Sequence, residues 1–292
     1  MSEPFRGTYT VLITPFTADG AAVDHAKLRQ LVEFQVDQGI DGLIPLGSTG
    51  EFLSVSREER TAITETVVAA AAGRVPVLMG TGAEDTRDAV ALSREAEALG
   101  ADGVMVIPPF YSVPTEQELY VHYRTIADAI GIPLMVYNNP ATANVDLTPA
   151  ILARLSTIDG CRYVKESTLE VTRVRDIIAA VDGRMAVFAG VLGYESAWLG
   201  AVGWVAVCSN VVPRLSRDMF AAAARGERDV ALPLYRRLAP LLPWVGGPRY
   251  VSGTKAAFRL MGMDMGPPRP PRLPLPPEDE AALRTVLDGV LG

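Results

Sequence analysis

Three lysines occur in the chain, and one of them ends an apolar run. Lys27 and Lys255 fall in amphipathic stretches and are interpreted as solvated helix residues, whereas Lys165 closes the run 162–165. An amine at the end of a buried strand loses hydration, which favours the neutral form that attacks a ketone. Lys165 is therefore a candidate Schiff-base nucleophile. An ion pair with a carboxylate such as Glu166 is the alternative, and position alone leaves both open.

A tyrosine and a polar turn are the other candidates for chemistry. Tyr137 ends the run 134–137, and the ends of neighbouring strands allow its side chain to face Lys165. The phenol could then move protons during carbinolamine formation, dehydration and C–C cleavage. The alternative is a tyrosine packed in the core with a satisfied hydroxyl. Residues 47–51, Gly-Ser-Thr-Gly-Glu, form a tight segment with two hydroxyls and several backbone N–H groups, which suits a carboxylate.

These residues need elements that bring several strand ends to one edge. Eight short apolar runs lack polar alternation, as strands buried on both faces do. They cover residues 9–13, 42–46, 75–80, 104–107, 134–137, 163–165, 185–190 and 204–207. Amphipathic stretches between them predict helices at 24–38, 57–72, 86–99, 116–129, 148–155 and 169–180.

The alternation of strands and helices predicts an α/β fold, a (β/α)₈ TIM barrel, whose working residues lie at the C-terminal ends of the strands. A doubly wound open sheet is the alternative, but no GxGxxG turn follows the first strand. Glycine motifs at 39–42, 100–103 and 200–203 precede strands. We expect the first glycine of each to end a helix in the left-handed conformation.

The pattern changes to helices alone after residue 210. We predict a barrel catalytic domain at 1–210 and a C-terminal helical subdomain at 211–292 that packs on the barrel. The predicted helices of this extension are 215–225, 230–242, 249–261 and 278–291. The proline-rich strap at 267–277 is interpreted as a rigid connector.

Composition narrows the class of protein. The 292 residues are 49 % hydrophobic and 21 % charged with a net charge of −7, which is ordinary for a soluble globular chain and argues against nucleic acid or an anionic membrane as partner. Residues 1–10 lack an apolar leader pattern and no apolar run approaches bilayer length. Cys161 and Cys208 form no CxxC pair, so we expect a reducing, cytoplasmic location. His25 and His122 are interpreted as surface or boundary helix residues, so a zinc site or a histidine-based catalytic triad lacks its parts. No other feature of the sequence calls for a metal, nucleotide or flavin cofactor.

Four segments, taken in order, resemble the dihydrodipicolinate synthase / N-acetylneuraminate lyase family of class I pyruvate-dependent aldolases and lyases. They are Gly-Ser-Thr-Gly-Glu at 47–51, Pro-Pro-Phe-Tyr at 108–111, Tyr-Asn-Asn-Pro at 137–140 and Lys-Glu-Ser at 165–167. The resemblance covers nearly the whole chain, including the helical tail. It implies a lyase that takes pyruvate, a 2-keto acid, and an aldehyde, and a homotetramer built as a dimer of dimers.

The resemblance also implies catalytic roles for matching positions. Lys165 is expected to be the Schiff-base lysine, and Tyr137 the acid/base that also contacts the keto-acid carboxylate. Ser48 is expected to bind that carboxylate together with Thr49 and to relay protons. Tyr111 corresponds to the relay tyrosine that reaches the site of a neighbouring subunit.

Four further positions are expected to contact substrate. Gly47 belongs to the carboxylate-binding turn, and Gly190 and the backbone of Val205 are expected to line the lysine. At Thr142 the sequence departs from the family's true synthases, which carry an arginine two residues after the proline of the tyrosine motif. Threonine cannot clamp a carboxylate as an arginine does.

The neutral hydroxyl of Thr142, flanked by Asn139 and Asn144, suits a polyhydroxylated chain. The sequence therefore favours reversible aldol cleavage of a 2-keto-3-deoxy sugar acid to pyruvate and an aldehyde. One alternative is a 4-hydroxy-tetrahydrodipicolinate synthase, which condenses pyruvate with aspartate semialdehyde. Others are a Schiff-base dehydratase or deaminase and a keto-acid-binding protein without turnover.

Overall fold

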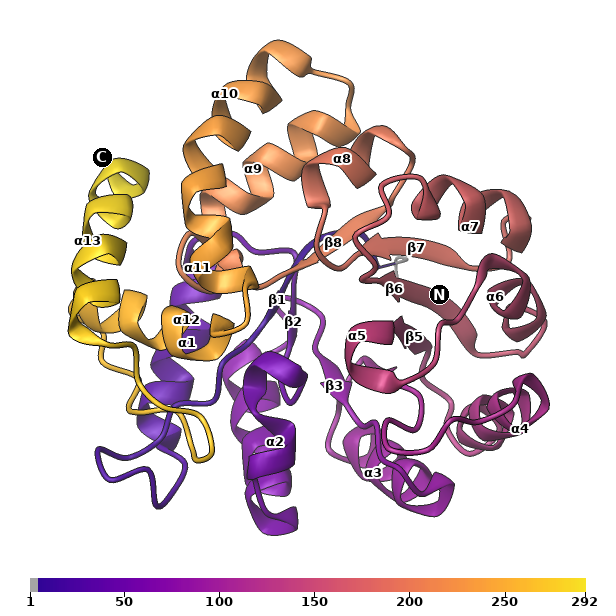
Figure 1. Ribbon diagram of the computed structural model, residues 1–292. Helices are drawn as coiled ribbons and strands as arrows, with labels where there is room; N and C mark the ends of the chain where they lie inside the picture. Colours follow the sequence, from indigo (N-terminus) through magenta and orange to yellow (C-terminus); the bar gives the residue numbers. More distant parts are fainter. Residues whose placement is uncertain (1–4) are drawn as a thin grey trace. The chain divides into compact units, whose positions relative to one another are not determined.

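The strands of the computed structural model form one eight-stranded sheet in the order β2-β1-β8-β7-β6-β5-β4-β3 (Figure 1). The structure describes residues 5–292, so Met1–Pro4 of the N-terminal stretch analysed above lie outside the described residues. The strands are β1 (Gly7–Val11), β2 (Gly42–Ile44), β3 (Leu78–Gly80), β4 (Gly103–Val106), β5 (Leu134–Asn138), β6 (Cys161–Glu166), β7 (Ala186–Ala189) and β8 (Gly203–Ala206). β1 pairs with β2 in parallel, as do the successive pairs from β3 to β8.

Helices follow the strands in the expected alternation. Those between strands are α1 (His25–Asp37), α2 (Arg57–Ala71), α3 (Thr86–Ala98), α4 (Glu116–Ala127), α5 (Pro140–Ala143), α6 (Pro149–Leu155), α7 (Arg173–Val181) and α8 (Gly193–Trp198). Those after β8 are α9 (Pro213–Ala224), α10 (Arg228–Leu238), α11 (Leu242–Gly246), α12 (Tyr250–Leu260) and α13 (Pro277–Leu291). This order is that of a (β/α)₈ TIM barrel with C-terminal helices, as predicted. The short helices α5 and α8 were not predicted, because neither spans two turns and so neither shows a helical period.

Contacts within the chain separate two units. The first comprises residues 5–7 and 76–205, and the second comprises Thr8–Val75 and Ala206–Gly292. The boundary between a barrel domain at 1–210 and a subdomain at 211–292 stays a prediction.

Glycines shape the entry into several strands. Gly39, Gly100 and Gly200 have φ values of 78°, 90° and 97°, which confirms the expected left-handed helix ends. Glycine is also required where β8 begins in the first unit, because a Cβ on Gly203 would lie 2.1 Å from Phe188 Cε1. The ring of Phe188 is fully buried and meets Tyr163 edge-on at 5.9 Å, so the sheet and its aromatic core depend on this close approach.

A buried polar network joins β1 to the segment after β8 in the second unit. Thr10 Oγ1 lies 2.6 Å from Gln35 Oε1 and 2.8 Å from Ser209 Oγ. The Asn210 side chain donates to Val11 O at 2.8 Å and accepts from Ile13 N at 3.1 Å. These bonds satisfy backbone groups that leave the strand ladder where β1 ends.

Two residues interpreted as exposed are buried. Lys255 is only 2 % exposed, because residues 251–258 of α12 are all buried. The interpretation of Lys255 as a solvated helix residue is therefore wrong. His122 is 3 % exposed, and its Nδ1 lies 2.8 Å from Thr86 Oγ1. Burial lowers the pKa of His122 to about 4, against a smaller opposing effect of the Glu84 charge, so the ring is neutral at pH 7.

Candidate active site

The first unit brings Lys165 and Tyr137 together at the ends of β6 and β5. The two residues are register partners across the parallel strands, so their side chains share a face of the sheet. Each is 5 % exposed. The Nζ of Lys165 lies 3.9 Å from the centroid of the Tyr137 ring. The amine and the phenol therefore meet in a largely desolvated place, as the sequence predicted.

The phenol of Tyr137 has a hydrogen-bond donor and a lowered pKa. Asn139 Nδ2 donates to its Oη at 2.9 Å. Burial raises the pKa of Tyr137, but the charge of Lys165 and hydrogen bonds involving Asn139, Lys165 and Ser167 outweigh it, so the net pKa lies below the usual value. A phenol of lowered pKa next to an amine is a good proton relay.

The residues that follow Tyr137 and Lys165 point to the opposite face of the sheet. Asn138 Nδ2 donates to Glu166 Oε2 at 2.8 Å, and Thr168 N donates to Glu166 Oε1 at 2.6 Å. Successive side chains on a strand alternate in direction, so the Glu166 carboxylate faces away from Lys165. On that face Glu166 accepts hydrogen bonds from neutral donors. The alternative of an ion pair between Lys165 and Glu166 is therefore wrong.

An acidic and a basic residue extend this arrangement into the loops. Arg173 donates from its two terminal nitrogens to the two oxygens of Asp146 at 3.1 and 2.9 Å, and Asn138 Nδ2 lies 3.2 Å from Asp146 Oδ1. We call Asn138, Glu166, Asp146 and Arg173 the Asn138 network. It links the ends of β5 and β6 to the loops behind them, and sequence reasoning missed it. Its one visible signal is a polar residue directly after each candidate catalytic residue.

The loop that carries Tyr111 is fixed by polar side chains. The Glu84 carboxylate accepts from the backbone N–H groups of Phe110, Tyr111 and Ser112 at 2.8, 2.9 and 3.0 Å. Asn144 Nδ2 donates to Phe110 O at 2.9 Å. The Tyr111 side chain is 86 % exposed, so an ordered backbone presents a phenol to the outside of the chain. Its reach into a neighbouring subunit stays a prediction.

The other predicted residues of the first unit also lie near the ends of strands. The backbone N–H and the hydroxyl of Thr142 donate to Asn139 O at 3.0 and 3.3 Å, which ties this exposed threonine to the partner of Tyr137. A Cβ on Gly190 would lie 1.8 Å from Ser167 Oγ, so only glycine fits there. Val205 is fully buried in β8.

The predicted carboxylate-binding turn lies in the second unit. Residues Ser48–Gly50 form a single 3₁₀ turn, in which Thr49 is buried and Ser48 half-buried. The turn begins after Gly47, the other predicted member. It is flanked by Leu46 and Glu51, two non-glycine residues with φ values of 58° and 55°. Such strained positions are held only where the surroundings enforce them, and they are frequent at functional sites.

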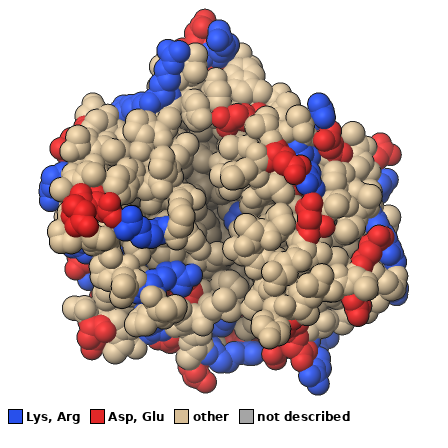
Figure 2. Space-filling model, in the orientation of Figure 1, with Lys and Arg blue, Asp and Glu red and all other residues tan. Residues whose placement is uncertain are grey.

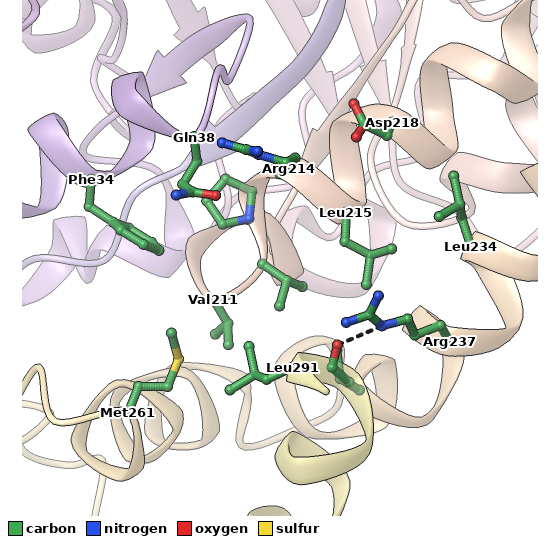
Figure 3. A pocket seen from close by; sticks show the side chains of 13 residues that line it. Phe34, Gln38, Val211, Arg214, Leu215, Asp218, Leu234, Arg237, Met261 and Leu291 are labelled. Atoms are coloured by element: carbon green, nitrogen blue, oxygen red, sulfur yellow. Dashed lines mark hydrogen bonds between the residues drawn. The ribbon is translucent and has the colours of Figure 1, made fainter.

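The molecule offers other features that do not join this site. A hollow of about 490 Å³ lies on helices of the second unit and contains none of the predicted residues (Figure 3). There, Arg237 Nε donates to Val290 O at 2.8 Å. Basic and acidic side chains are interspersed on the face shown in Figure 2. Burial raises the pKa of both cysteine thiols to about 12, so neither is a ready nucleophile.

Residues 5–292 contain neither a membrane-spanning helix nor a cluster of metal ligands. None of the helices described there is long and apolar enough to cross a membrane. In the same part of the chain, His, Cys, Asp and Glu side chains form no group that could hold a metal ion.

Known proteins resemble this chain in sequence and in fold. A family described as "Dihydrodipicolinate synthetase family" matches residues 4–289. Proteins named 4-hydroxy-tetrahydrodipicolinate synthase are 36 % identical in Nitrobacter hamburgensis and 39 % in Methanothrix thermoacetophila, each over 97 % of this chain and 96 % of the relative.

Two solved structures show the same architecture. A putative dihydrodipicolinate synthetase from Pseudomonas aeruginosa gives a TM-score of 0.95 at 33 % identity and covers 98 % of this chain and all of that one. The dihydrodipicolinate synthase of Acinetobacter baumannii, solved with pyruvate, gives 0.92 at 33 % identity and 98 % coverage of both chains. The TIM-barrel fold is thereby confirmed. The chain belongs to the dihydrodipicolinate synthetase family, and it is an enzyme of that family's Schiff-base lyase class.

Proposed function

We propose that the chain binds pyruvate as a Schiff base on Lys165 and uses it to make or break a C–C bond with an aldehyde. The observation that carries the proposal is the desolvated pair of Lys165 and Tyr137, with 3.9 Å between the amine and the phenol ring. The pyruvate complex of the Acinetobacter baumannii relative supports the same ligand for this chain.

The proposed chemistry uses the lysine as nucleophile and the tyrosine as relay. The neutral amine of Lys165 adds to the ketone carbon of pyruvate and gives a carbinolamine, which loses water to form the iminium. Loss of a C3 proton gives the enamine, whose C3 then adds to the aldehyde carbon. Hydrolysis releases the product, and the reverse sequence cleaves it. Tyr137 carries the protons of the addition and dehydration steps, since its pKa is lowered beside Lys165.

The remaining predicted residues take roles that rest on family likeness. We propose that Gly47, Ser48 and Thr49 receive the pyruvate carboxylate and that Ser48 relays protons together with Tyr111 of a neighbouring subunit. Gly190 and Val205 line the lysine. This arrangement requires a homotetramer or at least its dimer, and we propose that the enzyme works in the cytoplasm.

Two aldehyde partners have separate support. The curated relatives, at 34–40 % identity, are named 4-hydroxy-tetrahydrodipicolinate synthase, which favours aspartate semialdehyde. Thr142 favours the second candidate, cleavage of a 2-keto-3-deoxy sugar acid, because no cation stands at that position. The Arg173 guanidinium does not replace it, since Asp146 and Glu170 occupy it. On balance we place the synthase reaction first.

Covalent trapping tests the Schiff base. The chain is incubated with pyruvate and borohydride, and the adduct is located by peptide mapping. We expect one reduced pyruvyl adduct on Lys165 and none on Lys27 or Lys255. A chain that takes up no adduct would refute the proposal.

Steady-state assays then decide the partner. Consumption of aspartate semialdehyde with pyruvate is compared with pyruvate release from 2-keto-3-deoxy sugar acids, as kcat/KM. A dominant first reaction establishes the synthase, and a dominant second one the aldolase. Loss of water or ammonia from a keto acid without release of an aldehyde would instead identify a Schiff-base dehydratase or deaminase.

A further inference from the structure

Glu51 ends the predicted carboxylate-binding turn and is itself buried at 1 % exposure. Its Oε1 lies 2.9 Å from Lys255 Nζ, and its Oε2 accepts from Arg269 N at 2.9 Å. Lys255 also donates to Pro267 O at 2.8 Å. A fully buried ion pair is weak evidence for stability, since desolvation of both charges opposes their attraction. A role in fixing one local geometry accounts better for its presence.

The aromatic ring of Phe16 lies between two cations of this cluster. Lys255 Nζ is 4.2 Å and Arg269 Cζ is 4.1 Å from the centroid of the ring. Phe16 N also donates to Met265 O at 3.1 Å, just before the proline-rich strap, so the loop after β1 is joined to Met265 by its backbone and to the strap by the Arg269 side chain. The cations thus have partners other than carboxylates, which keeps them in place.

Arg269 ties the strap to two more segments of the second unit. Its guanidinium donates to Gly20 O, Ala21 O and Ser54 O at 3.0, 3.0 and 2.7 Å. It also forms a two-pronged ion pair with Glu59 at 2.5 and 2.6 Å. The strap is therefore a fixed support, and Glu51 is bound to it by one ion pair and one backbone hydrogen bond.

The turn is held between this support and the loop that follows β1. Thr14 Oγ1 donates to Gly50 O at 2.7 Å on one side, and Glu51 reaches Lys255 on the other. Glu51 directly follows the 3₁₀ turn that contains Ser48 and Thr49, and its backbone is left-handed, with a φ of 55°. Its side chain contacts Lys255 from this position.

We propose that Glu51 and Lys255 are positioning residues, which hold the 47–51 turn in the shape that receives the carboxylate of the keto acid. The inference rests on the proposed function of Ser48 and Thr49. The inference adds to that function a role for Lys255, which would support substrate binding without contacting the substrate. Loss of the pair would leave the Lys165 nucleophile intact and would weaken the binding of pyruvate.

The test removes both charges at once, because removal of one would strand the other in the interior. The double variant Glu51→Gln/Lys255→Met keeps an acceptor for Arg269 N and an apolar stem over Phe16. Lys27→Met, a half-exposed lysine of the same unit, is the matched control. The fraction of chain reduced onto Lys165 by borohydride is measured against pyruvate concentration, with the thermal midpoint in parallel.

We expect the half-saturating pyruvate concentration of the double variant to rise about tenfold, or ~1.4 kcal/mol. Maximal trapping and the thermal midpoint should stay close to wild type. Peptides covering 47–54 should exchange amide hydrogens faster, whereas Lys27→Met should change neither quantity. A folded double variant with wild-type half-saturation overturns the positioning role.

A second variant covers the case in which the double variant does not fold. Glu51→Asp keeps both charges and shortens the side chain by one methylene, so that the carboxylate is withdrawn from Lys255 Nζ; it is measured in the same way, and the half-saturating pyruvate concentration should again rise. If neither variant folds, the pair serves folding rather than positioning, and the inference is overturned. A wild-type chain without a Lys165 adduct is a distinct result, because it refutes the proposed function and this inference together.

Discussion

The Asn138 network of the first unit and the Glu51–Lys255 pair of the second unit place a buried carboxylate beside a candidate functional segment, but they neutralise it differently. Glu166 accepts from the Asn138 amide and from Thr168 N, and the Arg173 guanidinium of the same network pairs with Asp146. Glu51 meets a buried cation directly at 2.9 Å.

The difference separates two kinds of support. The first region lies behind the residues proposed to do chemistry, and its buried carboxylate, Glu166, is held by hydrogen bonds from neutral donors. The second region backs the residues proposed to bind a carboxylate, and it does so with full charges. Removal of one partner of a buried ion pair costs about 3–5 kcal/mol, whereas loss of one hydrogen bond costs about 1–3 kcal/mol. We therefore expect a single substitution in the Glu51–Lys255 pair to lower the free energy of unfolding more than a single substitution in the Asn138 network does.

The largest effect should come from the chemical side of the comparison. Tyr137→Phe removes the phenol beside Lys165 and leaves the ring. Loss of a positioned acid/base group should lower kcat by about 10²–10⁴-fold, with a much smaller change in KM. The measurement is steady-state kinetics with the preferred aldehyde. An unchanged kcat would show that Tyr137 is only a packed core residue.

On the stability side, Lys255→Met alone should be the most damaging change, because it leaves Glu51 charged and buried. Burial lowers the pKa of Lys255 to about 8, against the opposing charge of Glu51, so the ammonium is still charged at pH 7. We expect a loss of about 3–5 kcal/mol in the free energy of unfolding in urea. Lys27→Met should cost under about 1 kcal/mol. If Lys255→Met and Lys27→Met lower the free energy of unfolding equally, the buried ion pair contributes no more to stability than an exposed lysine does.

Asn138→Ala should have an intermediate effect. It removes the amide that serves Glu166 and Asp146 and the acceptor for Leu147 N, which lies 2.9 Å away. We expect a loss of about 2 kcal/mol in stability. Because Asn138 follows Tyr137 directly, kcat should also fall. If stability falls while kcat is preserved, the network supports the loops but not the catalytic pair.

An effect of similar size on stability concerns pH and the buried His122 of the first unit. Burial holds His122 neutral, with a pKa of about 4 in the fold against 6.5 for an exposed ring. The unfolded chain therefore binds more protons below pH 6.5, and stability falls as the pH falls toward 4. We expect a loss of about 2 kcal/mol between pH 7 and 5 from this group. In His122→Asn the slope of stability against pH should flatten over that range, and an unchanged slope would assign it to other groups.

Local patterns were sufficient to predict much of the fold and the central pair of the site. Strands buried on both faces and helices with an apolar face leave periodic traces in the sequence. The approach of Lys165 to Tyr137 follows from those traces, because parallel strands end at the same edge. The left-handed conformation of Gly39, Gly100 and Gly200 could also be predicted, because each begins a glycine motif that precedes an apolar run.

The missed residues depend on partners that are distant in the sequence. Lys255 looks like a surface residue until Glu51 and Phe16 are placed against it. The Asn138 network needs two loops whose conformations no periodicity encodes. Local sequence patterns therefore do not predict which charged residues of this molecule are buried.

The grip of Arg269 and Lys255 on the 47–51 turn has a consequence for how the enzyme is made. Synthesis proceeds from the N-terminus, so the turn, Tyr137 and Lys165 all leave the ribosome well before residues 255–269. A nascent chain can thus contain every proposed catalytic group while Glu51 still lacks its cation. If Glu51 and Lys255 have the proposed positioning role, the 47–51 turn reaches its final shape only after α12 and the strap have been synthesised.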